Sequence, residues 1–491
     1  MAGVSSLLGV LLQPLLYSGT AFAQQISLSG AAPSDCPNVP SSNGAPVVAT
    51  GFSAQLVATG LSGPRGLVLD SKGALLVVEQ GKGIKRLTLS DNGGSCLTVA
   101  QTTTLVQNTD LTHSIEVSQD GKTLFASTSD EVFSWAYDVD TASVSNQRTI
   151  IKNMTNSDHI SRTLLLSRKQ PDLLLVSRGS GENIDKLAAH EPNGISQIRA
   201  FNLSALPPGA VYDYPSQGRS LGWGLRNSVG VAEHPVTGGV YSVENSADQL
   251  SRSQTDIHQD NPGEELNFHG YLNGTTEDGQ GTNYGYPTCF ALWKTDGFPD
   301  LASGMRVGSQ FALDPKDDGA CASDYTSPRL TFQAHTAPLD IKFNANGTLA
   351  YVTFHGSWNR DEPVGYKLSV VSFGDGSRGE PAEPADSTAA AVDVLTNADL
   401  AACPGACFRP VGLAVDDDTG RVFMTSDSTG EIYVVQRLPG AGGLAAGPSS
   451  GVSARLGLLW FDGGLLPLVG WTLVVSAVLG GGVMFAVPVS G

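Results

Sequence analysis

The sequence is poor in positive charge. It carries 29 lysine and arginine residues against 47 aspartate and glutamate residues, a formal net charge of −18 over 491 residues. No run of basic residues interrupts this balance. Because nucleic-acid binding depends on clustered lysine and arginine side chains that neutralise phosphates, the composition argues against a nucleic-acid partner.

Three further patterns are missing. No long segment keeps the 3.6-residue apolar period of a helix, so the chain belongs to the all-β class. The glycine fingerprint G-x-G-x-x-G does not occur between a strand and a helix with a later acid, so a Rossmann site for NAD or FAD is unsupported. No two cysteines form a C-x-x-C pair, which argues against a zinc site.

The six cysteines and four glycosylation sequons are typical of an oxidising secretory route. The sequons begin at Asn153, Asn202, Asn273 and Asn346. Six cysteines allow 15 pairings, so the sequence alone leaves connectivity open. Proximity favours Cys403 with Cys407 and Cys289 with Cys321, which leaves Cys36 with Cys96.

Both ends of the chain differ in composition from its middle. Residues 1–23 end in an A-F-A site and resemble a signal peptide without the usual basic start. Residues 438–462 form a small-residue linker with a candidate GPI attachment site, and residues 463–491 are uncharged and mostly apolar. We therefore expect one folded domain over residues 24–437, extracellular and attached through a lipid anchor. A single C-terminal transmembrane helix is the alternative.

A hairpin pattern recurs six times in the middle of the chain. Each copy is an apolar alternating strand, a turn such as D-S-K-G, N-A-N-G or D-D-T-G, and a second β-rich strand. The copies begin at Gly66, Ser114, Thr163, Val229, Leu339 and Gly412. The first three are spaced like four-stranded propeller blades of roughly 40 to 50 residues. The pattern predicts a six-bladed β-propeller with a long insertion between the fourth and fifth repeats.

A cation or an imidazole stands at the start of the first strand in every copy. These residues are Arg65, His113, His159 with Arg162, Arg226, His335 and Arg409. One arginine before a strand is usually a solvated strand end, but six of six in an acidic chain predict a positive pocket around the channel with an anionic occupant. Pyrroloquinoline quinone, a flat molecule with three carboxylates, suits such a pocket because arginine binds carboxylates through a fork and stacks on rings.

Seven ordered motifs carry a family resemblance. They are "SDHISRTLLLS", "LRNSVGVA", "NPGEELNF", "NYGYP", "HTAPLDIKF", "FHGSWNR" and "CFRPVGLAV". With them the chain resembles, over roughly residues 50–437, the soluble quinoprotein glucose/sorbosone dehydrogenases, and within these the fungal pyranose dehydrogenases that use pyrroloquinoline quinone. The resemblance implies a catalytic propeller that oxidises a sugar.

The resemblance also implies roles for individual residues. His159 would be the general base that takes the proton of the sugar hydroxyl while hydride passes to the quinone, and Asp158 would orient it or tune its charge. Arg226 would stabilise negative charge on the cofactor. The predicted cofactor-binding set is Arg65, His113, Arg162, Arg226, Asn227, His335, Trp358, Arg360 and Arg409.

Calcium is implied at two places. The backbone carbonyls of Ser246 and Ala247 would hold a catalytic ion against the quinone, while Glu264, Glu265 and Tyr284 would form a second, structural site. The bacterial members usually carry Gly-Pro where this chain has Ser246 and Ala247. They also carry two glycines in place of Ile160 and Ser161.

The expected partners are a small sugar and a separate electron acceptor, either a haem protein or a diffusible quinone, because no haem domain or cellulose-binding module is recognised. Two other functions stay open at this point. A calcium-dependent propeller lactonase would need carboxylates and asparagines around the ring, where this chain supplies His and Arg. A non-catalytic binding propeller at the cell surface would hold an acidic ligand in the same ring.

Overall fold

The computed structural model describes residues 36–37, 39–41, 44–273 and 280–441, which all belong to a compact unit spanning Met1–Gly447. The predicted signal peptide, the apolar tail and all but the first residues of the linker lie outside the described residues, so these expectations stay predictions. Among the described residues, no helix is long and apolar enough to cross a bilayer.

The described chain folds into six large sheets, each built on an antiparallel four-stranded blade, and two small two-stranded sheets. The first blade contains β3 (Pro64–Leu69), β4 (Leu75–Glu79), β5 (Gly83–Asp91) and β6 (Leu97–Gln107). The second contains β7 (Leu111–Val117), β8 (Thr123–Thr128), β9 (Val132–Asp138) and β10 (Ser143–Lys152), with the short β14 (Tyr212–Asp213) at its edge. The third contains β11 (Leu164–Leu166), β12 (Leu173–Arg178), β13 (Gln197–Asn202) and β15 (Arg219–Trp223).

The second half of the chain builds the other three blades. The fourth contains β16 (Ser228–Glu233), β17 (Gly239–Glu244), β20 (Glu264–Tyr271) and β23 (Leu330–Phe332). The fifth contains β24 (Pro338–Phe343), β25 (Leu349–Phe354), β26 (Lys367–Ser372) and β27 (Ala391–Thr396), with β1 (Val47–Val48) at its edge. The sixth contains β28 (Pro410–Asp416), β29 (Arg421–Ser426) and β30 (Glu431–Arg437), and is completed by β2 (Phe52–Ala58).

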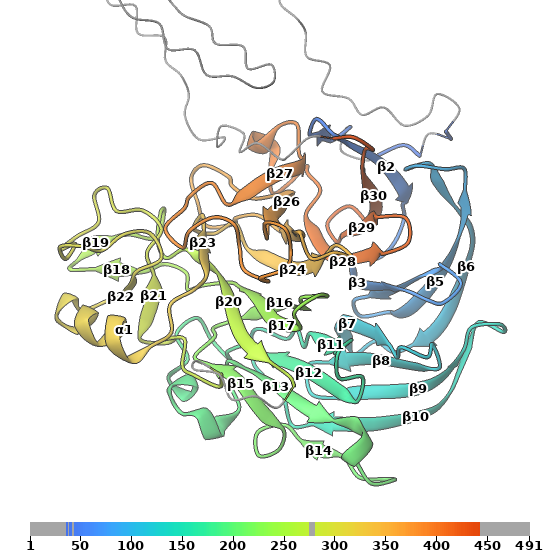
Figure 1. Ribbon diagram of the computed structural model, residues 1–491, viewed down its shortest axis with the longest axis horizontal. Coiled ribbons are helices and arrows are strands. Elements are labelled where there is room, and N and C mark those ends of the chain that lie inside the picture. Colours follow the sequence, from blue (N-terminus) through green and yellow to red (C-terminus); the bar gives the residue numbers. More distant parts are fainter. Residues whose placement is uncertain (1–35, 38, 42–43, 274–279, 442–491) are drawn as a thin grey trace, which may run out of the picture. The chain divides into compact units, whose positions relative to one another are not determined.

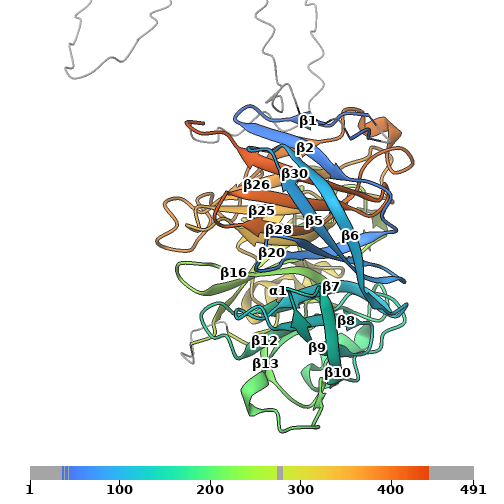
Figure 2. The same cartoon turned by 90° about the vertical axis from the view of Figure 1, so that its right-hand side faces the viewer.

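The innermost strands of the six blades close a ring. Contacts join β3 to β7, β7 to β11, β11 to β16, β16 to β24, β24 to β28, and β28 back to β3. Figure 1 shows the blades arranged around this ring in chain order, and Figure 2 shows them from the side, one sheet beside the next. Pairing of β2 with β30 joins the N-terminal strand to the last blade. The predicted six-bladed β-propeller is confirmed.

Glycine allows the innermost strands to approach one another. A Cβ atom on Gly66 of β3 would lie 2.6 Å from the carbonyl oxygen of His113, and one on Gly412 of β28 would lie 2.4 Å from that of Arg65. Neither distance is possible for a side chain, so the repeated glycine at this strand position is a packing requirement of the ring. A cavity of about 200 Å³ remains between the innermost strands.

Apolar side chains between neighbouring blades form the core. Leu76 and Val78 of β4 pack with Ile115 and Leu124 of the second blade, all fully or almost fully buried. Similar clusters separate the other neighbours. Each sheet is therefore buried on both faces, which explains the weak alternation of "TLLLS" and the other innermost strands.

Short elements occupy the connections between strands. The fourth blade carries β18 (Ser251–Arg252) and β19 (Thr255–Asp256) before β20, then β21 (Cys289–Ala291), β22 (Gln310–Ala312), η4 (Pro315–Asp317) and α1 (Asp318–Asp324) before β23. The third blade carries η1 (Lys186–Ala189), η2 (Glu191–Asn193) and η3 (Leu203–Ala205), and η5 (Leu400–Ala402) precedes β28.

All six cysteines lie within the described residues and form disulfides. The pairs are Cys36–Cys96, Cys289–Cys321 and Cys403–Cys407. These are the pairs that proximity in sequence favoured. The second bridge ties β21 to α1, and therefore holds together the connection that follows β20.

Candidate functional site

The histidine of "SDHISRTLLLS" lies on the loop between β10 and β11, against the end of β12. Its Nδ1 is 2.9 Å from Ser180 Oγ and 3.0 Å from the Ser180 carbonyl oxygen. A Cβ on Gly179 would lie 2.8 Å from His159 Cβ and 2.5 Å from Asn227 Oδ1. Glycine at position 179 therefore lets His159 and Asn227 both pack against the same side of the backbone, where a side chain would otherwise lie.

The His159 imidazole is a weak base in this setting. Burial and the nearby Arg226 charge lower its pKa to about 4, although Asp158, the Ser180 hydrogen bond and Asp248 act in the opposite direction. Asp158 is exposed, and within the described part of the chain its carboxylate makes no hydrogen bond to the imidazole. Of the two alternatives expected for Asp158, the geometry favours tuning the charge of His159 over orienting the ring, and its role in catalysis stays a prediction.

Arg162 is bonded to the backbone of its own loop. Its side chain is completely buried, and its guanidinium donates to the carbonyl oxygens of His159 at 2.7 Å, Ser161 at 2.6 Å and Met154 at 2.6 Å. Burial lowers its pKa to about 9. Arg162 therefore holds the His159 loop, while its Nε atom has no hydrogen-bond partner among the described residues, and the cofactor contact expected for it stays a prediction.

A carboxylate on the loop after β17 joins three of the expected cofactor-binding loops. Asp248 Oδ2 accepts from the Arg226 guanidinium at 2.9 Å, and Asp248 Oδ1 accepts from Asn359 Nδ2 at 2.8 Å and lies 3.4 Å from His335 Nδ1. Burial raises the pKa of Asp248, but the His335 hydrogen bond and the Arg226 charge outweigh it and leave the pKa lowered. Asn183 fixes the Asp248 backbone through two hydrogen bonds of 2.8 and 2.9 Å.

A second carboxylate serves the opposite part of the ring. Asp427, which follows β29, pairs with Arg65 at 2.7 Å and with His355 Nε2 at 2.9 Å. Burial raises the pKa of Asp427, and the His355 hydrogen bond and the Arg65 charge bring it below its ordinary value. Burial and the Arg65 charge lower the pKa of His113 strongly, so its imidazole is neutral.

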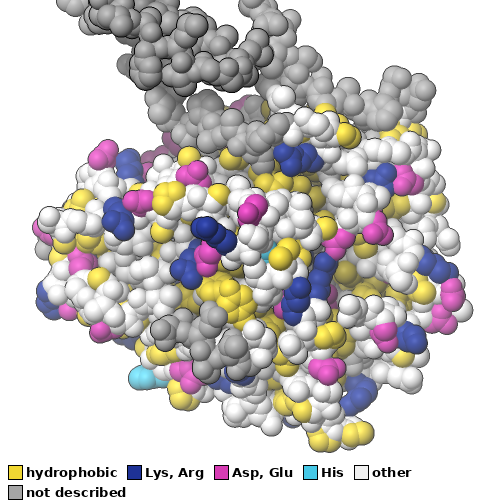
Figure 3. Space-filling view, in the orientation of Figure 1, with side chains coloured by type: hydrophobic (Ala, Val, Ile, Leu, Met, Phe, Trp, Pro, Cys, Tyr) yellow, Lys and Arg dark blue, Asp and Glu magenta, His cyan; other side chains and the backbone are white. Residues whose placement is uncertain are grey.

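Arg409 has no carboxylate partner among the described residues. Its guanidinium donates to the carbonyl oxygens of His355 and Gly356 at 3.1 and 3.0 Å and lies 5.5 Å from the centre of the Tyr366 ring. The ring is therefore not one uniformly positive pocket, because Asp248 and Asp427 offset part of its charge. Basic and acidic side chains lie close together near the middle of the face in Figure 3.

The remaining donors around the ring fit a polyanionic ligand. The Arg65 Nε and His113 Nδ1 atoms are buried and have no hydrogen-bond partner among the described residues, and Arg409 makes no salt bridge there, although the Asp427 charge acts on it. A polar atom that is buried without a partner costs free energy unless a ligand supplies one. Carboxylates of a bound cofactor would satisfy these groups.

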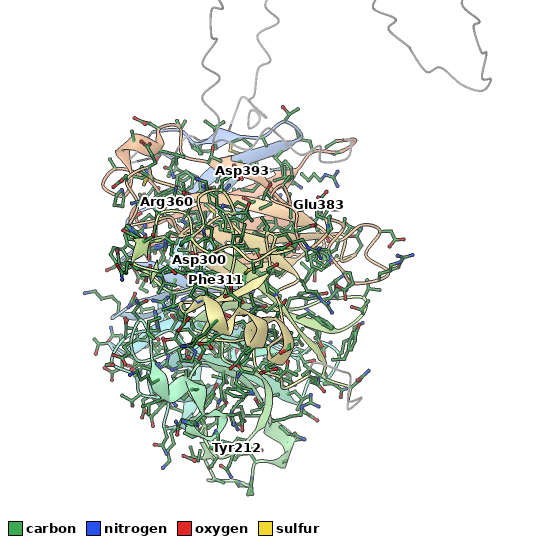
Figure 4. The ribbon with its side chains drawn as sticks, turned by 90° about the vertical axis from the view of Figure 1, so that its left-hand side faces the viewer. Tyr212, Asp300, Phe311, Arg360, Glu383 and Asp393 are labelled. Carbon is green, nitrogen blue, oxygen red and sulfur yellow. A yellow bond between two sulfur atoms is a disulfide. The ribbon has the colours of Figure 1, made fainter. Side chains whose placement is uncertain are left out.

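Trp358 and Arg360 lie on the loop after β25. The Trp358 side chain is 66% exposed, more than the other large apolar side chains noted as exposed in the described chain. An indole left in water offers a face on which a flat or sugar ring can stack. Arg360 is mostly buried, 3.5 Å from Asp260, and lies well away from Tyr212 of β14 in Figure 4.

The side chains proposed for a structural calcium site do not converge on one point. Glu264 and Glu265 are consecutive in β20 and so point to opposite faces of the sheet. Glu264 accepts from the backbone N–H groups of Ser246 and Ala337, while the Tyr284 hydroxyl donates to the Phe268 carbonyl oxygen. No group of three or more His, Cys, Asp or Glu side chains with metal-binding geometry occurs in the described part of the chain.

Glu265 instead faces another glutamate. It is the register partner of Glu244 on β17, and Asn267 Nδ2 donates to both carboxylates, at 3.2 and 2.9 Å. Burial and mutual repulsion raise the pKa of Glu244 strongly, and burial raises that of Glu265 to about 7. The Asn267 Oδ1 atom is buried without a partner. The two buried carboxylates share one amide donor, and a hard cation with its preference for oxygen ligands could relieve their repulsion.

Sequence inspection of strand starts missed half of the site. The additional residues are Ser180, Glu244, Asp248, His355, Asn359 and Asp427. Each of them ends or follows the second strand of its blade, which runs back to the face where the first strand begins. In an antiparallel hairpin the end of the second strand lies beside the start of the first. Polar residues at the ends of β12, β17, β25 and β29 were therefore the signal that could have located most of them.

The chain is similar in sequence to known proteins. Residues 46–438 match the family profile described as TrAA12-like. The chain is 51% identical over 403 residues to a pyrroloquinoline quinone-dependent sugar dehydrogenase of Hypocrea jecorina (strain QM6a), covering 80% of this chain and 90% of that protein.

Two solved structures are similar in fold and sequence. A calcium structure of the Trichoderma reesei carbohydrate-active enzyme family AA12 has 51% identity and a TM-score of 0.78, with 82% of this chain and 99% of that chain covered. The holo form of the pyranose dehydrogenase PQQ domain from Coprinopsis cinerea has 37% identity and a TM-score of 0.76, with the same coverage.

Proposed function

The chain belongs to the AA12 family of PQQ-dependent sugar dehydrogenases, and we propose that it oxidises the C1 hydroxyl of a pyranose by hydride transfer to pyrroloquinoline quinone. The observation that carries the proposal is a neutral imidazole, His159, beside a ring of Arg65, Arg226 and Arg409. Neither the lactonase nor the non-catalytic binding propeller is retained, because the family assignment makes this protein a sugar dehydrogenase.

When bound, the quinone supplies the hydride acceptor. The groups that would hold it are Arg409, which makes no salt bridge among the described residues, together with the partnerless Arg65 Nε and His113 Nδ1 atoms. Arg226 and Asn227 lie on the His159 side of the ring. Arg226 would stabilise negative charge there while Asp248 holds its guanidinium in place.

His159 would act as the base. Because its pKa is about 4, the imidazole is neutral at neutral and mildly acidic pH and can accept the proton of the sugar hydroxyl. After accepting the proton, the His159 imidazole would carry a positive charge beside that of Arg226. The negative charge of Asp248 would partly balance it. Trp358 would offer its exposed indole to the apolar face of the sugar ring.

Calcium is proposed at two positions. Ser246 and Ala247 would present backbone carbonyls to the ion, and the Glu264 carboxylate, which accepts from Ser246 N at 2.7 Å, anchors the backbone where this segment begins. For a structural ion, the set formed by Glu244, Glu265 and Asn267 fits better than the set of Glu264, Glu265 and Tyr284. The reason is that the Glu244 and Glu265 carboxylates come from paired residues and share the Asn267 amide as a hydrogen-bond donor.

We also propose that the protein is extracellular, which the three disulfides support. A separate haem protein or a diffusible quinone would collect the electrons. The connection carrying β18, β19, β21, β22 and α1, inserted in the fourth blade between the fourth and fifth repeats, would shape the sugar pocket, because Ala247 packs in the same cluster as Phe290 and Phe311.

Reconstitution tests the proposal. Purified apoprotein is mixed with pyrroloquinoline quinone and calcium chloride, and the cofactor's absorbance and the sugar-dependent bleaching of a redox dye are followed with a panel of pyranoses. We expect a shifted cofactor spectrum and turnover of at least one sugar. If both are absent with every sugar, the proposed function is wrong.

Two histidine variants sharpen the test. His159→Ala should reduce turnover by about 10²- to 10⁴-fold with cofactor binding largely retained. His190→Ala, which removes an exposed imidazole at the end of η1, is the matched control and should leave turnover unchanged. Loss of cofactor binding in His159→Ala would show that His159 holds the cofactor and is not the base.

A further inference from the structure

A chain of hydrogen bonds lies behind the His159 imidazole. Nδ1 faces two oxygen atoms of one residue, the Ser180 hydroxyl at 2.9 Å and the Ser180 carbonyl at 3.0 Å. The Ser180 hydroxyl in turn donates its proton to the carbonyl oxygen of Glu182 at 2.8 Å. Ser180 is completely buried, so water does not compete for these contacts.

These contacts specify which ring nitrogen carries the proton. A carbonyl oxygen can only accept, and the single hydroxyl proton of Ser180 is already given to Glu182. Both atoms that face Nδ1 are therefore acceptors, so Nδ1 must be the protonated nitrogen of the neutral ring. The lone pair then lies on Nε2, which makes no hydrogen bond to any residue that the structure describes.

The position of Ser180 is itself fixed from several sides. Its N–H donates to the Arg226 carbonyl oxygen at 2.8 Å, and Asn156 Nδ2 donates to the Gly179 and Ser180 carbonyl oxygens at 2.6 and 3.1 Å. The serine therefore connects the His159 loop, the end of β12 and the segment before β16. A shift of Ser180 would move both His159 and Arg226.

We propose that Ser180 is the positioning residue of the base, holding His159 with the proton on Nδ1 so that Nε2 receives the proton of the sugar hydroxyl. This inference rests on the proposed function for its catalytic consequence, but the protonation of the ring can be measured without catalysis. A neutral serine orients the imidazole without adding the charge of a carboxylate partner. The charged groups that face His159 are then Arg226, Asp158 and Asp248.

Nitrogen NMR of the apoprotein tests the tautomer directly. The protein is labelled with ¹⁵N-histidine, and the His159 signals among the eight histidines are assigned by their loss in His159→Gln. At pH 7 we expect a neutral ring protonated on Nδ1. A ring protonated on Nε2 would overturn the proposal, whatever the activity of the enzyme.

A pair of serine variants tests the role of the hydroxyl. Ser180→Ala keeps the backbone acceptor and removes the hydroxyl, so we expect a mixture of tautomers and a decrease in kcat of roughly two- to tenfold with KM for the sugar unchanged. Ser369→Ala is the matched control, because Ser369 on β26 is equally buried and hydrogen-bonded to Asp393 at 2.9 Å. It should change neither the His159 spectrum nor kcat.

The outcomes separate the two hypotheses. Wild-type protein without quinone-dependent turnover, but with His159 protonated on Nδ1, would refute the proposed function and leave the assignment of Ser180 standing. Normal turnover with an unchanged tautomer and kcat in Ser180→Ala would refute the role of the hydroxyl. If Ser180→Ala does not fold, the tautomer of the wild-type protein still tests the proposal. Ser180→Thr, which keeps a hydroxyl at this position, then takes the place of Ser180→Ala, and we expect it to behave like the wild type.

Discussion

The acid limb of the pH profile should report the buried setting of His159. The neutral imidazole is the active form of the base, so kcat/KM should be constant at neutral pH and fall as the pH drops through the pKa of about 4. Because burial lowers the pKa of His159, kcat/KM begins to fall at a lower pH than it would with a histidine in water as the base.

The expected contrast is large. With a pKa of about 4, kcat/KM at pH 5 should still be about 90% of its value at pH 7. With the ordinary value of about 6.5 it should be about 4%. Asp248 and Asp427 do not contribute to this limb, because their pKa values are held below the ordinary value of an aspartate.

The assay is dye reduction at saturating cofactor and calcium, with sugar well below KM, between pH 3.5 and 8. Asp158→Asn serves as a second measurement. Because Asp158 raises the pKa of His159 but is exposed, its removal should move the acid limb to lower pH by less than about 0.5. An acid limb at pH 6 or above in the wild type would refute the assignment of a buried, Arg226-depressed base.

Three other perturbations have expected outcomes. Arg252 is fully buried with a bidentate bond to Asp318, both at 2.7 Å, so Arg252→Met should lower the free energy of unfolding by about 3–5 kcal/mol in urea titrations. Arg168→Met, which removes an exposed pair, should cost less than about 1 kcal/mol, and equal effects would contradict this reasoning. Arg409→Gln should weaken quinone affinity roughly 10- to 100-fold in absorbance titrations without unfolding the protein, and unchanged affinity would exclude Arg409 as a ligand. Removing calcium with a chelator should lower Tm, and Glu265→Gln should abolish most of that response; a full response in the variant would place the ion elsewhere.

The Arg252 effect also has a functional side. Arg252 contacts the rings of Phe298 and Phe311 and the Asp300 carbonyl oxygen, and Figure 4 shows Asp300 and Phe311 close together. Ala247 packs in the same cluster. Loss of Arg252 should therefore reduce activity as well as stability.

Much of the fold was predictable because it is written in local patterns. Each hairpin copy contains its own turn residues and its own apolar strands, so six copies could be counted and each one paired as expected. The three disulfides joined the cysteines that proximity favoured. The positions of Arg65, Arg226 and Arg409 followed from the same register, since each stands at the start of an innermost strand.

The partners of these residues were not predictable in the same way. Asp427 lies 362 residues from Arg65, and Asp248 reaches Asn359 from the neighbouring blade, so only closure of the ring brings them together. The division of the expected positive pocket by two carboxylates is a consequence of that closure. In the sequence Arg162 resembles the other residues at the strand starts, but in the structure its guanidinium is buried and donates to backbone carbonyl oxygens.

The sequence by itself determined the blade count, the residue types around the channel and the identity of the base candidate, because these depend on periodicity and turn chemistry within short segments. Only the tertiary structure decided which nitrogen of His159 is free, that Ser180 and not Asp158 holds the ring, and that Glu244 faces Glu265. Those features depend on hydrogen bonds and charges between segments far apart in the chain. The physical reason is that a short sequence pattern determines the side of the strand to which a side chain points. The charge state and orientation of that side chain depend on residues that only folding brings close to it.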